Sequence, residues 1–136
     1  GQGMNCGFED CTIFAEMLDA ANGNWDGLLS AYSKERVPDG NAIIDLSLRN
    51  YVEMRDLTGN KDWLLRKKIE AKFSERYPDK WLPLYSQVTF SEIRYSVAYK
   101  QGQAQAGIMD EVMAMENIEE RWDSEEVMEQ ILSRCN

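Results

Sequence analysis

The sequence predicts a mainly α-helical fold in a single domain. Its 136 residues suffice for one ordinary hydrophobic core but not for two. Apolar residues recur at intervals of three and four along most of the chain, and no internal repeat or low-complexity linker interrupts them. Only residues 82–90, which follow Pro78 and include Pro83, lack a helical pattern. They are expected to form one short extended segment.

The first half of the chain predicts three helices. Residues 6–21 are apolar on nearly every side, which is typical of a buried helix. A shorter helix is expected over residues 25–36 and another over residues 41–57. The sequence Pro-Asp-Gly at residues 38–40 is typical of a turn and is expected to separate these two helices.

Residues 62–77 have the clearest helical pattern of the chain. Apolar side chains recur there every four residues, at Leu65, Ile69, Phe73 and Tyr77. Pro78 is expected to end the helix. The basic residues of this segment are interpreted as its solvated face: Arg66, Lys67, Lys68, Lys72 and Arg76.

The last third of the chain is also expected to be helical. The pattern resumes over residues 91–117 with a glycine-containing interruption. A final helix capped by Ser124 is predicted from one apolar stripe, made of Val127, Met128, Ile131, Leu132 and Cys135. Residues 109–136 carry nine of the 24 acidic side chains and two of the 15 basic ones. An acidic solvated face explains this better than a metal site, because no alternating Asp/Asn loop with its glycine is present.

Composition excludes several classes of function. A net charge of −9 argues against binding to nucleic acid or to an anionic membrane surface. No apolar run approaches the roughly 18 residues that span a bilayer, and no secretory signal is seen. Three unevenly spaced cysteines do not make a disulfide framework, so the cytoplasm is the expected location. Histidine is absent, so any chemistry is expected to depend on a cofactor or a further segment.

The opening of the chain is rich in glycine. Residues 1–7 are expected to form a loop whose backbone N–H groups, together with the following helix dipole, favour a negatively charged ligand. The loop is not a dinucleotide fingerprint, because Cys6 occupies the position of its last glycine. From composition alone, Gly1–Gly3 would be interpreted as a cloning remnant ahead of a start codon for Met4.

Longer strings favour a different interpretation. The string GQGMNCGFED at residues 1–10 resembles the flavin-contacting motif of flavoprotein aromatic hydroxylases. The strings DLSLRNYVEMR at residues 45–55 and PLYSQVTFSEIRY at residues 83–95 resemble the kynurenine 3-monooxygenase branch of that family. The three strings follow the order of the family. The resemblance covers residues 1 to about 100 and does not extend into the acidic tail.

The resemblance implies that this chain is the C-terminal portion of a longer enzyme. Residues 1–24 would end the FAD-binding domain, residues 25–108 would be a helical substrate-covering region, and residues 109–136 would be an acidic helical tail. The N-terminal FAD domain is absent from this sequence, so no activity is expected of the chain alone. A domain deprived of that partner would expose apolar surface, and the chain is expected to self-associate.

The family activity implied is hydroxylation of L-kynurenine to 3-hydroxy-L-kynurenine with FAD, NADPH and O2, in tryptophan degradation toward quinolinate and NAD. By resemblance, Gly3, Met4 and Asn5 contact the flavin mainly through the backbone. Asn50 and Tyr85 would donate hydrogen bonds to the substrate carboxylate, and no protein side chain is assigned a catalytic acid or base role.

Helical spacing adds Glu53 and Met54 to the substrate site. Both lie on the same face as Asn50, and an amide and a carboxylate beside a thioether suit an amino acid with an aromatic end. For each residue taken alone, a solvated strip or a packing role is the competing interpretation. Two other functions remain open: another flavin-dependent aromatic hydroxylase, or a free-standing helical interaction module.

Overall fold

The computed structural model describes residues 2–135, so Gly1, the first residue of the expected loop, lies outside the described residues. The described chain forms seven α-helices, one π-helical turn and no strand, which confirms the mainly α prediction. The helices are α1 (Gln2–Ala20), α2 (Leu28–Val52), the π-helical turn η1 (Glu53–Leu57), α3 (Lys61–Arg76), α4 (Leu84–Phe90), α5 (Tyr95–Met113), α6 (Ile118–Arg121) and α7 (Glu125–Arg134).

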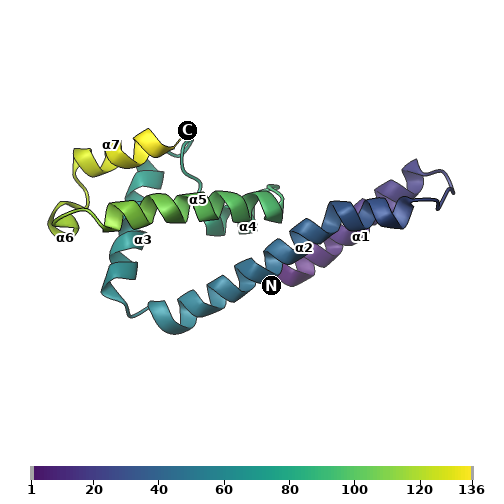
Figure 1. Ribbon diagram of the computed structural model, residues 1–136, viewed down its shortest axis with the longest axis horizontal. Helices are drawn as coiled ribbons and strands as arrows, with labels where there is room; N and C mark the ends of the chain where they lie inside the picture. Colours follow the sequence, from purple (N-terminus) through teal and green to yellow (C-terminus); the bar gives the residue numbers. More distant parts are fainter. Residues whose placement is uncertain (1, 136) are drawn as a thin grey trace.

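Helices α1 and α2 run side by side as a long hairpin that extends away from the other helices (Figure 1). The turn between them depends on positive φ angles at Gly23 (80°) and Gly27 (75°), a conformation that glycine adopts without strain. Helix α5 lies at the centre of the molecule and contacts α2, α3, α4 and α7 (Figure 1).

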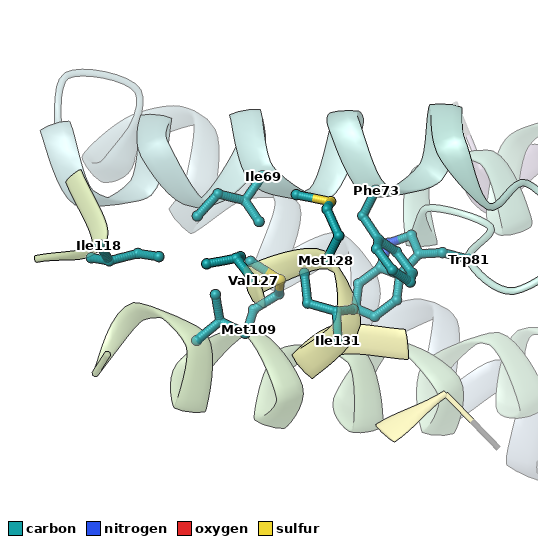
Figure 2. Packing of buried hydrophobic residues seen from close by; sticks show 9 residues of the cluster. Ile69, Phe73, Trp81, Met109, Ile118, Val127, Met128 and Ile131 are labelled. Atoms are coloured by element: carbon teal, nitrogen blue, oxygen red, sulfur yellow. The ribbon is translucent and has the colours of Figure 1, made fainter. Parts of the chain in front are cut away.

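The main hydrophobic core lies between α3, α5 and α7, where the apolar side chains point toward one another (Figure 2). Ile69 and Phe73 of α3 are completely buried, as the four-residue spacing predicts. The tail supplies much of this core through Met109, Val127 and Ile131. The expected cap of α7 is confirmed, because Ser124 Oγ accepts a hydrogen bond of 3.4 Å from the Val127 N–H.

A second, smaller core joins the hairpin to α5. Its buried residues are Cys6 of α1, Ala42, Ile43 and Leu46 of α2, and Tyr95 of α5. Leu84 and Val88 of α4 pack against its edge. Helix α4 is therefore fixed by contacts with both α2 and α5.

The predicted turn at residues 38–40 is wrong, because α2 continues through Pro38 without a break. Asp39, which is completely buried, accepts hydrogen bonds from the Ser96 N–H at 2.9 Å and from Arg94 Nε at 2.9 Å. Arg36 Nη1 donates to the same carboxylate at 3.1 Å. The tertiary bonds from Ser96 and Arg94, together with this bond within α2, hold the segment helical and outweigh its local preference for a turn.

Two further predictions near α4 and α5 are wrong. Residues 84–90 form α4 rather than an extended segment, because Pro83 precedes a helix that it cannot disturb from that position. Helix α5 has no interruption at its glycines. Gly102 instead allows α4 to approach closely, since a Cβ atom there would lie 2.6 Å from Cδ2 of Leu84.

The prediction of a buried first helix is also wrong. Cys6 is the one buried side chain among the described residues of α1, whereas Met4 is 68% and Phe8 65% exposed. Ile44 and Leu48 of α2 are exposed as well. We call these four residues the exposed hairpin side chains. None of the described helices combines the length and apolar character needed to cross a membrane.

The contact between Gly102 and Leu84 predicts opposite effects for two glycine substitutions in α5. Gly102→Ala should lower the free energy of unfolding by up to about 2 kcal/mol, because overlap of the new methyl group with Leu84 costs about 1–3 kcal/mol and the gain in helix propensity offsets about 1 kcal/mol of it. The matched control Gly107→Ala, with nothing within 4 Å of its added Cβ, should raise it by about 1 kcal/mol through helix propensity. Urea unfolding measures both. Equal stabilisation by the two substitutions would mean that α4 does not pack closely on Gly102.

Candidate functional site

A cavity of about 620 Å³ opens between α2, η1, α3, α4 and α5. All four side chains that the sequence analysis assigned to the substrate line it: Asn50, Glu53, Met54 and Tyr85. They come from two segments separated by some thirty residues in the chain, and α3 lies between those segments in sequence. The fold therefore brings these predicted residues to one place.

The wall formed by α2 and η1 carries three of these residues at the point where the α-helix becomes a π-helical turn. The Asn50 amide Nδ2 lies 3.5 Å from the Met54 sulfur, so amide and thioether are neighbours on the wall. Glu53 is half-buried and its Oε1 accepts a hydrogen bond of 2.9 Å from Arg49 Nε. A single π-helical turn inside a helix is frequently found at functional sites.

Tyr85 faces this wall from the first turn of α4. Its ring is 67% exposed and packs edge-on against Phe90, with the ring centroids 6.1 Å apart. The exposed position argues against a mainly packing role for Tyr85, because few protein atoms surround its ring.

The opposite wall, from α3, supplies residues that the sequence analysis did not assign to a site. Lys67, which was interpreted as solvated, lines the cavity and pairs with Glu70 at 2.9 Å. Its ammonium also lies 5.7 Å from the centre of the Trp63 ring. No local pattern identifies these residues, because the packing of α3 against α5 decides which face of α3 lines the cavity.

The cavity combines apolar and charged surfaces. Ile43, Leu46, Leu84 and Val88 supply apolar side chains to its lining. The ion pairs Arg49–Glu53 and Lys67–Glu70 line it as well. Such a surface suits a ligand with an aromatic body and a zwitterionic end.

The residues assigned to the flavin lie near this cavity but in a different conformation from the one expected. Gly3, Met4 and Asn5 belong to the first turns of α1, so the glycine-rich loop prediction is wrong for residues 2–7. The first turn of a helix still leaves backbone N–H groups without intrahelical partners. Gln2 lines the cavity and donates a hydrogen bond of 3.2 Å from Nε2 to Thr89 Oγ1 of α4.

Those N-terminal residues are accessible to a ligand. Met4 and Asn5 are exposed, and a Cβ atom at Gly3 would meet nothing within 4 Å.

Within residues 2–135, no group of three or more Cys, Asp or Glu side chains is arranged to hold a metal ion.

Known proteins resemble this chain over nearly its whole length. No family model matches it. A kynurenine 3-monooxygenase of Christiangramia forsetii is 51% identical over 133 residues, which is 98% of this chain and 30% of that protein. One from Flavobacterium psychrophilum is 47% identical over 136 residues, which is 100% of this chain and 30% of that protein. One from Sus scrofa is 43% identical over 110 residues, which is 81% of this chain and 23% of that protein.

These similarities show that the chain corresponds to part of a monooxygenase. The particular enzyme that it resembles is kynurenine 3-monooxygenase, as the three sequence strings predict. The chain spans about 30% of the length of the first of these relatives, consistent with the expected C-terminal portion. The similarity extends through the acidic tail, which the sequence analysis had left outside it.

Proposed function

We propose that this chain is the C-terminal, substrate-covering part of an enzyme that hydroxylates L-kynurenine to 3-hydroxy-L-kynurenine with FAD, NADPH and O2. The observation that carries the proposal is the single cavity lined by Asn50, Glu53, Met54 and Tyr85. The match of almost the whole chain to kynurenine 3-monooxygenases supports it over a free-standing interaction module. The reaction belongs to tryptophan degradation, and the free cysteines favour a cytoplasmic location.

Each end of L-kynurenine has a suitable partner in the cavity. The Asn50 amide and the Tyr85 hydroxyl are donors for the substrate carboxylate. The Glu53 carboxylate suits the substrate ammonium group. Met54 and the apolar side chains of α2 and α4 suit the aromatic ring. Another aromatic hydroxylase substrate that lacks the amino acid end would leave these polar groups without partners.

The start of α1 fits the role expected of it toward FAD. Gly3 and Met4 lie in the first described turn of α1, and their backbone N–H groups would contact a negatively charged flavin ring. Asn5 would also contact the flavin. FAD, when bound, supplies the oxygen-transfer chemistry. This chain's residues would orient the substrate and hold the charge of the flavin.

The substrate assignment predicts weaker binding when either donor is removed from the full-length protein. Tyr85→Phe or Asn50→Ala should raise the Kd for L-kynurenine by roughly ten- to a hundredfold, because a hydrogen bond to a charged group contributes about 1.5–3 kcal/mol. Titration calorimetry measures this Kd. Met4→Ala should change it less, since Met4 is assigned a backbone contact.

Thermal unfolding and FAD content serve as controls for these variants. Both should stay normal in Tyr85→Phe, because the tyrosine ring is largely exposed. Unchanged affinity combined with a lowered Tm would instead make Tyr85 a packing residue, and the substrate carboxylate would be bound elsewhere.

The isolated chain of 136 residues should neither retain FAD nor oxidise NADPH. The reason is that the proposed flavin contacts are confined to the first turns of α1, whereas a dinucleotide domain is expected to be about 100–200 residues long. Absorbance of the purified chain between 350 and 500 nm measures bound flavin. A yellow protein with one flavin per chain would contradict this expectation.

The isolated chain should also self-associate. The exposed hairpin side chains, Met4, Phe8, Ile44 and Leu48, would be covered by the remainder of a longer enzyme and are open when the chain stands alone. Light scattering over a range of concentrations should show a mass that rises above that of one chain. A variant with Phe8→Ser and Leu48→Ser should shift the equilibrium toward the monomer. A constant monomer mass for the unsubstituted chain would refute the idea.

A further inference from the structure

We infer that Arg49 is a positioning residue that holds the Glu53 carboxylate in place for the ammonium group of the substrate. The inference rests on the proposed function and adds a residue to it. Arg49 and Glu53 both line the cavity, four residues apart on α2 and η1. Arg49 Nε donates to Glu53 Oε1 at 2.9 Å, in good hydrogen-bond geometry.

The attraction between Arg49 and Glu53 is stronger than that of an ordinary surface ion pair, because both side chains are partly buried. The side chains of Arg49 and Glu53 are 35% and 23% exposed. By contrast, Arg55 and Asp56 form a neighbouring pair whose side chains are 57% and 43% exposed and which does not line the cavity. Partial burial reduces screening by water, so removing Arg49 should affect Glu53 more than removing Arg55 affects Asp56.

Arg49 contacts one of the two carboxylate oxygens of Glu53. The bond to Oε1 restricts the rotamers of a side chain that would otherwise move freely, and it leaves Oε2 as the atom assigned to the ammonium group. The restriction matters here because Glu53 is the first residue of the π-helical turn. Its direction is therefore not fixed by a regular α-helical neighbourhood alone.

An arginine in a cavity could alternatively bind the substrate carboxylate itself. The two roles differ in what they require of the ligand. An arginine that acts through Glu53 affects only ligands with an ammonium group. An arginine that binds the carboxylate affects every ligand that carries a carboxylate.

The experiment uses the full-length protein and two ligands, L-kynurenine and its analogue with hydrogen in place of the α-amino group. The Kd of each ligand is measured for the unsubstituted protein and for Arg49→Met, Arg49→Lys, Glu53→Gln, and Arg49→Met combined with Glu53→Gln. Arg55→Met is the matched control, and Tyr85→Phe reports on the carboxylate contact. FAD content and circular dichroism verify that each variant is folded.

Arg49→Met should raise the Kd for L-kynurenine by roughly three- to tenfold and leave that of the analogue within about twofold. The double variant should bind no more weakly than Glu53→Gln alone, because Arg49 has no role once the carboxylate is gone. Arg49→Lys should lose less affinity than Arg49→Met, since it keeps a cation. Arg55→Met should leave both Kd values unchanged.

Two results would overturn the role of Arg49 while leaving the proposed function intact. One is an equal loss for both ligands, which would assign Arg49 to the carboxylate. The other is no effect of Arg49→Met while Tyr85→Phe still weakens L-kynurenine. If the unsubstituted protein does not bind L-kynurenine, the proposed function fails, and this inference fails with it.

Discussion

The arrangement of the helices depends on Asp39, a completely buried carboxylate at which α1, α2 and α5 are joined. Burial by itself would raise the pKa of Asp39, but its hydrogen bonds with Ser96 and Arg94 lower that pKa below the usual range. Arg36 extends the network to α1 through Asp10 at 2.6 Å and Glu9 at 2.8 Å. A buried charge is tolerated only when its oxygens are paired in this way.

The network also determines how stability depends on pH. Because the pKa of Asp39 is lower in the fold than in the unfolded chain, its charged form contributes stability at pH values above the unfolded pKa. That contribution is lost as the pH falls through the folded pKa.

The same contacts fix the start of α5 against the middle of α2. Further along α5, Gly102 lets α4 approach, and the cavity lies between these elements. The geometry at Tyr85 therefore depends on a charge network that does not contact the cavity.

Local patterns in the sequence correctly predicted several features that depend on a single helix. The spacing of Ile69 and Phe73 and the cap at Ser124 are examples, and the shared face of Asn50, Glu53 and Met54 is another. Some of the predictions that failed concern residues whose role is set by distant partners. Pro-Asp-Gly at residues 38–40 has every local sign of a turn, and the bonds from Arg94 and Ser96, more than fifty residues away, help to explain its helical state. Lys67 lines the cavity for the same kind of reason, because the packing of α3 against α5 has no local signature.

If this cavity receives the amino acid end of L-kynurenine, a crystal structure of the full-length protein with L-kynurenine bound will show it. We expect the ligand carboxylate within hydrogen-bond distance of Asn50 and Tyr85, and its ammonium group within that distance of Glu53. Ligand density at another site, with solvent between these three side chains, would contradict it.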